Sequence, residues 1–235
     1  ARFASTRSKA TIGEPLMKHQ SLLLRQLKDV DMQLQHNKVT NLRLAVAKTS
    51  GILIRPGETF SVWKLVGRPT KRKGYLPGMT LHNGKIGVGI GGGLCQLGNL
   101  LYWMALHTPL TVTRRWRHSY DVFPDSGRTL PFGSGATLSY NYIDLQLRND
   151  TDQTFQINLW LSETHLHGAI CSDRPLAVEY VVFERAHRFE LQWWGGYTRH
   201  NEIWRKIVSR NQEMIDEELV TENHAVMMYN PLLPG

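Results

Sequence analysis

The sequence predicts an α+β protein, in which N-terminal helices and a cysteine-bearing helix pack on a largely antiparallel, strand-rich C-terminal part. Two observations carry this prediction. Apolar residues recur three and four positions apart in the first half of the chain, whereas period-two alternation dominates after residue 110. Helices come early and strands late, without the regular alternation that a parallel βαβ fold requires.

Composition and length set the frame for this fold. The 235 residues, of which 41% are hydrophobic and 20% charged, suffice for one large or two small domains with a buried core. The longest apolar run, Leu100 to Leu106, is far shorter than the roughly 20 residues of a transmembrane helix, so we expect no membrane span. Because the chain begins at Ala1, we expect an incomplete N-terminus, and localisation stays open between cytoplasm and cell envelope.

The formal charge of +8 is unevenly distributed. Residues 1–150 hold 21 Lys and Arg against 8 Asp and Glu, whereas residues 151–235 hold 7 against 12. A basic front part favours an anionic partner, such as a substrate that carries carboxylates. We expect no nucleic-acid partner, because no zinc-finger spacing, RNP-like strand or helix-turn-helix pattern accompanies the charge.

Two helices are predicted near the N-terminus. Apolar residues at Leu23, Leu27 and neighbouring positions fit one face of a helix over residues 17–34. A second helix is predicted over residues 41–50, with Thr40 or Asn41 as N-cap and Gly51 placed for a left-handed C-terminal conformation.

The middle of the chain predicts a strand, a loop and a third helix. Residues 52–63 are expected to form a strand and turn. Residues 84–93 contain six of the 20 glycines and predict a loop with an accessible backbone. The helical spacing of Leu97, Leu100, Leu101 and Met104 then predicts a helix that opens near Cys95 and is stopped by Pro109.

Strands are expected from Leu110 onward. The first is predicted to carry Trp116 on one face, Arg115 and Arg117 on the other, and His118 near its end. A slip of apolar parity between Tyr142 and Ile143 indicates a bulge or a crossing between sheets. The further strands are predicted at residues 136–148, 154–162, 165–172, 176–184, 188–193, 202–208 and 214–220.

Cys95 and His118 form the leading candidate site. A thiolate is the reactive form of cysteine, and the start of a helix lowers a thiol pKa. In this interpretation Gly92 and Gly93 admit the substrate backbone, Gln96 helps to hold an oxyanion, and His118 acts as base and later as acid. The alternative is a small buried Cys95 beside a hydrogen-bonded strand histidine.

A third, orienting residue is not fixed by the pattern, and Asp121, Asn141 and Asp144 are all possible. A disulfide between Cys95 and Cys171 is disfavoured by their contexts, because Cys95 follows a glycine run and Cys171 lies late in a predicted strand.

Other motifs carry weaker hypotheses. We expect no cofactor, because the GxGxxG match at residues 87–92 lacks a βαβ unit and no Walker motif follows it. The set His165, His167, Cys171 and Asp173 offers possible metal ligands, but exposed polar strand positions explain it better, and we expect no metal. The Trp193-Trp194-Gly-Gly-Tyr197 cluster can stack on sugar rings or, more commonly, close the edge of a β core.

Several motifs in combination resemble the VanW family. They are Pro56-Gly-Glu-Thr-Phe-Ser-Val-Trp63, Gly91-Gly-Gly-Leu-Cys-Gln96 with its following helix, His118-Ser119, and Gly135-Ala-Thr-Leu-Ser-Tyr with Arg148-Asn-Asp-Thr151. The resemblance suggests three parts: an N-terminal helical extension at 1–36, a VanW core at 37–151, and a β-rich C-terminal part at 152–235 that packs on the core.

The resemblance implies a bacterial cell-wall function. The family is named after gene clusters for resistance to vancomycin, which binds peptidoglycan precursor termini, and some larger VanW-domain proteins are regarded as cysteine L,D-transpeptidases. Carried over, this makes Cys95 the nucleophile and His118 its base, with Asp144 as a possible orienting residue, because Gly135 stands where many relatives have Asp.

The expected activity is therefore L,D-transpeptidase-like acyl transfer or amide hydrolysis on peptidoglycan stem peptides or cell-wall precursors. Arg115 and Arg117, with Arg114, could pair with substrate carboxylates. The alternative is a non-catalytic cell-wall or antibiotic-resistance accessory protein that uses the same fold for binding.

Overall fold

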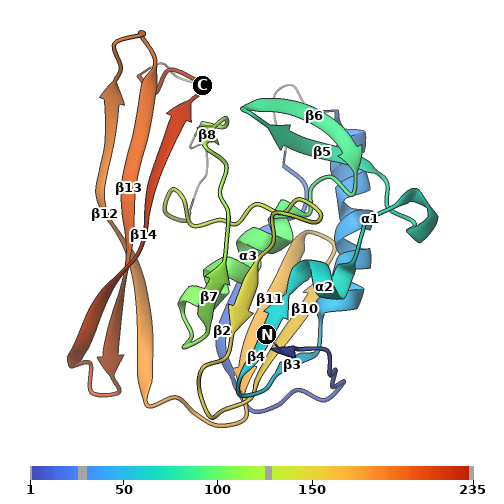
Figure 1. Ribbon diagram of the computed structural model, residues 1–235, viewed down its shortest axis with the longest axis vertical. Coiled ribbons are helices and arrows are strands. Elements are labelled where there is room, and N and C mark those ends of the chain that lie inside the picture. Colours follow the sequence, from blue (N-terminus) through green and yellow to red (C-terminus); the bar gives the residue numbers. More distant parts are fainter. Residues whose placement is uncertain (1, 26–30, 125–128, 233–235) are drawn as a thin grey trace. The chain divides into compact units, whose positions relative to one another are not determined.

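A computed structural model describes residues 2–25, 31–124 and 129–232 of the chain (Figure 1). It confirms the α+β class with a strand-rich C-terminal part. The chain divides into two compact units that are interleaved in sequence. The first unit holds Ala1–Thr80, Gly87–Trp116 and Ala136–Leu176, and the second holds Leu81–Ile86, Arg117–Gly135 and Ala177–Gly235.

The first unit contains two four-stranded sheets. One has the order β2-β11-β10-β3, and the other has the order β1-β4-β9-β7. Only β1 and β4 pair in parallel, so both sheets are otherwise antiparallel within the described residues. The strands are β1 (Arg2–Phe3), β2 (Pro15–Leu22), β3 (Ile52–Ile54), β4 (Glu58–Ser61), β7 (Thr111–Arg114), β9 (Gln146–Arg148), β10 (Phe155–Leu161) and β11 (His165–Ser172).

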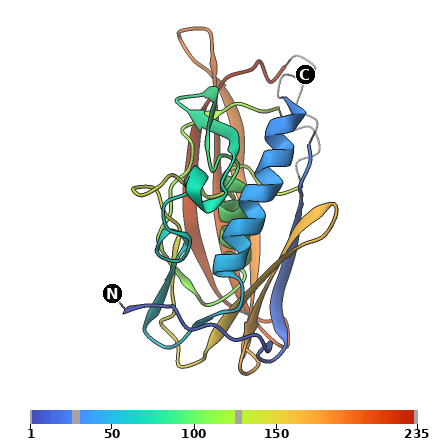
Figure 2. The ribbon, with the colours of Figure 1, turned by 90° about the vertical axis from the view of Figure 1, so that its right-hand side faces the viewer.

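Helices cover the β2-β11-β10-β3 sheet. Helix α1 (Met32–Thr49) contacts β10 and the short helix α2 (Val62–Val66), and α3 (Cys95–Leu106) contacts β2 and β11. Figure 2 shows α1 facing the viewer. Gly168 of β11 allows the close approach of α3, because a Cβ there would lie 2.5 Å from the Met104 methyl carbon. The core is thus an interface between helix and sheet, as the helical spacing over α3 predicts.

The motif around Pro56 builds a junction between strands. Gly57 has φ +75 in the turn before β4 and donates its backbone N–H to the Asn149 carbonyl at 2.9 Å. The buried Asn149 side chain donates in turn to the carbonyls of Ile54 (2.8 Å) and Gln153 (2.7 Å). Two of the family motifs therefore meet in the structure, and their polar residues satisfy backbone groups where the strands end.

The second unit is built on a meander of long strands, β12 (Val178–Leu191), β13 (Tyr197–Ser209) and β14 (Met214–Met227). The short strand β8 (Tyr120–Asp121) pairs with β14 in parallel. The strands predicted separately at 176–184 and 188–193 form one strand, whose register shifts between Arg185 and Arg188. The bulge interrupts the period-two alternation, so the sequence alone predicts two strands here.

The N-terminal helix prediction is wrong over residues 17–22, which form β2, so residues 1–36 are not a helical extension. Residues 26–30 of that prediction lie outside the described residues. Pairing with β11 decides the outcome for β2, since tertiary pairing overrides local helical spacing. Helix α1, which includes most of the second predicted helix, begins at Met32. Asp31 before it is the N-cap, and its carboxylate accepts the Gln33 N–H at 2.8 Å.

The glycine-rich segment also differs from its prediction. Most of it is strand β6 (Lys85–Ile90), which pairs with β5 (Pro77–His82) in a hairpin turned at Asn83 and Gly84, both with positive φ. The loop proper is confined to residues 91–94. A 3-10 helix, η1 (Lys71–Lys73), precedes the hairpin.

Two strand predictions around the site are shortened. The strand expected at 136–148 is reduced to β9, and the parity slip marks a turn at residues 140–142, flanked by a bridge between Ser139 and Ile143. The strand β7 ends at Arg114, so His118 does not lie on it. His118 belongs instead to the link between β7 and β8.

Candidate functional site

Cys95 is the first residue of α3 and lies against the segment 136–138. Its Sγ accepts the Leu138 backbone N–H at 3.4 Å and donates to the Leu138 carbonyl at 3.6 Å. Asn99 fixes the same segment by accepting the Ala136 N–H at 2.8 Å. Gly98 permits this approach, because a Cβ there would lie 2.6 Å from the Ala136 carbonyl oxygen. The thiol is thus held by the segment that carries the Ala-Thr-Leu part of the family motif.

Burial raises the pKa of the Cys95 thiol, although the backbone N–H groups of Leu138 and Cys95 itself favour the thiolate. The position of Cys95 at the start of a helix predicted a lowered thiol pKa. Desolvation outweighs the helix terminus because it penalises the charged form directly. The resting group at neutral pH is therefore the protonated thiol.

The glycines before Cys95 serve close packing. A Cβ on Gly92 would lie 2.1 Å from the Gly78 carbonyl oxygen, and one on Gly93 would lie 2.3 Å from the Lys38 Cγ. Asn41 of α1 adds a clamp by donating to the Gly92 carbonyl at 3.0 Å. Any ligand here therefore meets backbone groups of a loop that is fixed from both sides.

Two backbone N–H groups directly before Cys95 are suited to binding an anion. Within residues 2–25, 31–124 and 129–232, no hydrogen-bond acceptor is found for the N–H of Gly93 or of Leu94. Amide groups at the start of a helix carry partial positive charge and bind anions.

Gln96 connects α3 to β2. Its Nε2 donates to the Ser21 Oγ at 2.9 Å and to the Leu22 carbonyl at 2.8 Å. Both side-chain N–H groups are therefore engaged within the first unit, and the carbonyl oxygen is the part of this amide left for a ligand.

Lys38 is a residue of this region that sequence reasoning missed. Its aliphatic stem crosses Gly93, two residues before Cys95, and its Nζ donates to the Gln35 Oε1 at 2.7 Å. Burial, with the charge of Arg25, lowers the pKa of Lys38 to about 8. The sequence around Lys38 does not indicate this role, because Gly93 and Cys95, which lie near it in the fold, are far from it along the chain.

His118 lies in the second unit. Burial, followed by the charges of His82 and Arg117, lowers the pKa of this imidazole. The ring is therefore neutral at pH 7, which is the form that a general base requires.

Asp144 is buried and bound by three donors. Its carboxylate accepts the Ser61 hydroxyl at 2.6 Å, the Trp63 N–H at 3.2 Å and the Gln146 Nε2 at 3.0 Å. These contacts join the start of α2 to β9 and favour a structural role for Asp144.

The other two candidates for the orienting residue also have structural settings. Asp121 pairs with the buried Arg199 at 3.2 Å and accepts the Tyr229 hydroxyl at 2.9 Å, both within the second unit. Asn141 lies in the turn that precedes β9.

The arginines proposed for substrate binding are divided between the units. The guanidinium of Arg115 lies 4.5 Å from the centre of the Tyr102 ring in the first unit. Arg117 lies 4.8 Å from the Phe132 ring centre and donates to the His224 carbonyl in the second unit. Arg114 is exposed at the end of β7.

The weaker sequence motifs do not assemble a metal centre. Within the described residues, no group of three His, Cys, Asp or Glu side chains is placed to hold an ion. His165 and His167 share a strand face, with ring centres 5.8 Å apart, and His167 stacks on Trp160. Cys95 and Cys171 are both free thiols. Among the described helices, none is long and apolar enough to cross a bilayer.

Fold and site together define a class: α+β proteins in which a cysteine opens a helix and is held by a neighbouring loop. The family model described as "VanW like protein" matches residues 37–171, and the chain belongs to the VanW family. Cys95, His118 and Asp144 all lie within the matched range.

Two relatives show how far this similarity extends. The chain is 35% identical over 227 residues to "Vancomycin B-type resistance protein VanW" of Enterococcus faecalis, covering 97% of the chain and 82% of the relative. It is 29% identical over 117 residues to "Uncharacterized protein YoaR" of Bacillus subtilis, covering 50% of the chain and 37% of that protein. No solved structure matches the chain significantly. The similarity to the first relative runs through both units.

Proposed function

We propose that the protein performs cysteine-dependent acyl transfer on peptidoglycan stem peptides or related cell-wall precursors, as a transpeptidase-like enzyme or an amide hydrolase. The observation that carries the proposal is the surroundings of Cys95. The sulfur opens α3 beside the N–H groups of Gly93 and Leu94, which can receive the oxyanion of a tetrahedral intermediate.

The substrate class rests on the relative from Enterococcus faecalis, which is named as a vancomycin B-type resistance protein. Vancomycin acts on the peptide termini of cell-wall precursors, and these peptides carry the amide bonds and carboxylates that the proposed site needs. The Gly93 N–H and the Gln96 side-chain oxygen are the proposed contacts to the substrate backbone. Gly92, also predicted for this role, is already engaged, since its N–H donates to the Gly89 carbonyl and its carbonyl accepts from Asn41, both at 3.0 Å. Arg115 and Arg117 are the proposed contacts to its carboxylates.

The protonation states shape the proposed mechanism. Because the thiol is protonated at rest, its proton must leave as the S–C bond forms, and the neutral imidazole of His118 accepts it. The imidazolium then protonates the departing amine as the C–N bond breaks, which leaves a thioester on Cys95. An acceptor amine or water attacks the thioester and gives its proton to His118, and that proton returns to the sulfur as the C–S bond breaks.

Lys38 extends the proposed substrate site. Its aliphatic stem lies against Gly93, its Nζ lies at Gln35, and Arg25 contributes a second positive charge nearby. We propose that Lys38 holds a carboxylate of the stem peptide, since two neighbouring cations are stabilised when an anion binds between them.

Specific observations favour a second candidate, a non-catalytic cell-wall or resistance accessory protein. The raised pKa of Cys95 makes the thiol a poor nucleophile at rest, and Asp144 is committed to Ser61, Trp63 and Gln146. Gly135 occupies the position at which the family resemblance leads us to expect an Asp. In this alternative the loop before Cys95 binds a cell-wall fragment without turning it over.

Incubation with muropeptides separates the two functions. For the enzyme we expect transpeptidation or hydrolysis products by mass spectrometry, lost in Cys95→Ala and reduced at least about a hundredfold in His118→Ala. Cys171→Ala removes the other free thiol and serves as the matched control, with activity retained. Unchanged turnover in Cys95→Ala would refute the mechanism. Binding of muropeptides without any product would establish the accessory function.

A further inference from the structure

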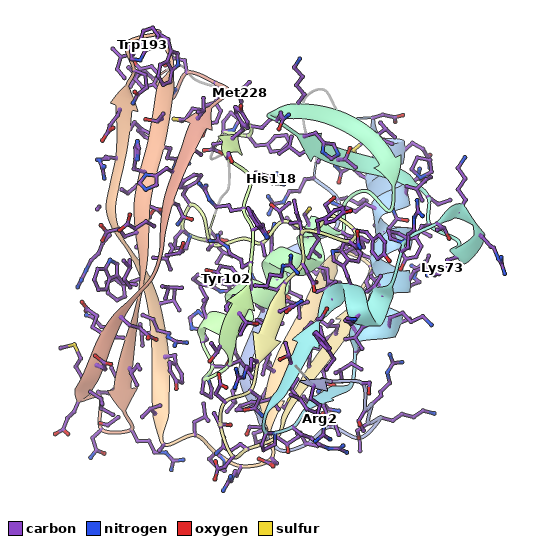
Figure 3. All side chains as sticks on the ribbon, viewed as in Figure 1. Arg2, Lys73, Tyr102, His118, Trp193 and Met228 are labelled. Atoms are coloured by element: carbon purple, nitrogen blue, oxygen red, sulfur yellow. The ribbon has the colours of Figure 1, made fainter. Side chains whose placement is uncertain are left out.

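The turn between β12 and β13 presents large apolar side chains to solvent. Trp193 is 92% exposed and Trp194 is 51% exposed, in a turn closed by the Gln192 N–H and Gly196 carbonyl at 2.8 Å (Figure 3). Leu191 before the turn is 66% exposed. We call Leu191, Trp193 and Trp194, with Met228 (49%) and Leu232 (72%) after the end of β14, the aromatic tip. Such exposure is incompatible with Trp193 closing the edge of a β core, the more common role for such a cluster.

The aromatic tip is free of charge. Residues 191–198 and 225–232 contain no Asp, Glu, Lys or Arg. The polar groups of the turn are used internally, since Gln192 donates to the Thr198 hydroxyl at 2.7 Å and Thr198 contacts the His200 ring at 2.8 Å. The tip therefore offers an apolar surface with few groups free to bind a polar ligand.

Charges in the second unit are arranged around this tip. The exposed Lys85 follows Gly84, and a Cβ on Gly84 would lie 3.2 Å from the Met228 sulfur. The acidic residues Glu179, Glu213, Asp216, Glu217 and Glu218 lie at the other end of the sheet. With about 3.3 Å per residue, the 14 residues of β12 separate that end from the tip by roughly 45 Å. Glu217 and Glu218 at that end are paired with Arg185 and Arg205, and Glu190, which precedes the tip, is paired with Arg188. The uncharged tip with Lys85 beside it is therefore the feature that distinguishes this end of the sheet.

We propose that the aromatic tip inserts into the headgroup boundary of a lipid bilayer that contains anionic lipids. Tryptophan favours this boundary because its ring is apolar and its N–H remains hydrated. Leu191 and Met228 add buried apolar area, and Lys85 faces the anionic headgroups.

The geometry favours lipid over a glycan strand. A sugar ring stacks on a flat aromatic face that is flanked by hydrogen-bonding side chains. Here the planes of Trp193 and Trp194 meet at 86°, with ring centres 5.6 Å apart, and their neighbours Leu191 and Met228 are apolar. A hydrocarbon boundary accepts this irregular apolar surface without requiring directional contacts.

Vesicle binding of the whole chain tests the proposal. We expect co-sedimentation with phosphatidylcholine vesicles that contain phosphatidylglycerol, and quenching of tryptophan fluorescence by lipids brominated on the acyl chains. The Trp193→Ser, Trp194→Ser double variant should lose more than about tenfold in vesicle affinity, because two partly buried indoles are worth more than 1.4 kcal/mol. Lys85→Gln should lose about fivefold on the anionic vesicles.

The control is Trp160→Ser, which removes an indole that is 46% exposed in the first unit and should leave vesicle affinity unchanged. Because the tip is exposed, circular dichroism should show the same thermal unfolding for the double variant and the unmodified chain. Equal vesicle affinity of these two proteins would overturn the proposal. So would retention on purified peptidoglycan that depends on Trp193 and Trp194 in the absence of vesicle binding, because it would assign the tip to a glycan.

Discussion

At the scale of single residues, the chemistry of Cys95 depends on the competition between desolvation and the start of α3. Leu138 provides one donor and one acceptor to the sulfur, and burial still dominates the pKa. A cysteine at a helix start is thus no sufficient sign of a low pKa. Burial of the sulfur by the surrounding residues, which Gly98 allows to pack closely, has a larger effect on the thiol pKa than the start of the helix.

Alkylation of Cys95 tests this balance. A thiol reacts with iodoacetamide only in proportion to its thiolate form, and burial has raised the pKa above the ordinary value of 9.0. We therefore expect slow modification of Cys95 from about pH 6 to pH 8 and a steep rise only above pH 9, followed by mass spectrometry of the peptide. A rate that has already reached its plateau near pH 7 would contradict the raised pKa and indicate an ion pair with an imidazolium.

Lys38 provides a second titration. Its pKa of about 8 predicts that a ¹³C-dimethylated Lys38 changes its chemical shift with a midpoint near pH 8, whereas an exposed lysine titrates near about 10.4. Because the folded pKa is depressed, the charged form costs stability below pH 8, and this cost disappears as the pH rises toward the unfolded value. Lys38→Met identifies the resonance. A midpoint above pH 10 would show that this ammonium is fully solvated.

At the scale of elements, the polar residues of the family motifs mainly connect the ends of helices and strands. Asp144 links the N-cap of α2 to β9, and Asn149 closes the ends of β3 and β4 through backbone groups. Such side chains appear in sequence only as polar residues beside strands. Their partners are brought in by sheet pairing between segments far apart in the chain.

The Asp144 joint carries a stability prediction. Asp144→Ala leaves the Ser61 hydroxyl and the Trp63 N–H without their acceptor in a buried site, so we expect a loss of about 2 to 4 kcal/mol in the free energy of unfolding. Urea denaturation measures it. Asp150→Ala is the matched control, because its ion pair with Arg148 is exposed and should contribute less than about 1 kcal/mol. Equal stability of both variants would show that Asp144 is not a structural joint.

At the scale of the whole molecule, each unit is assembled from stretches that are separate in sequence. The first unit combines N-terminal, central and later segments, and the second returns through residues 81–86 and 117–135 before its long strands. Cys95 and Asp144 belong to the first unit and His118 to the second. The activities of Cys95→Ala and His118→Ala therefore test one proposed residue in each unit.

Some features follow from the sequence alone because they depend on neighbours along the chain. The spacing of Leu97, Leu100 and Leu101 produces α3 with Cys95 at its start, and the turn predicted within residues 52–63 forms at Pro56 and Gly57. The order of the motifs along the chain was sufficient to identify the VanW family. The sequence thus determined the fold class, the family and the position of the thiol on its helix.

Only the tertiary structure decided the features that arise from contacts between distant segments. Residues 17–22 became a strand because β11 offered a partner, and the run before Cys95 became tightly packed because Gly78 and Lys38 lie against it. The protonation of Cys95 is of the same kind, since solvent is excluded by atoms that no local pattern specifies. Burial and pairing are properties of the assembled chain, and they set the chemistry of a residue whose place the sequence had already fixed.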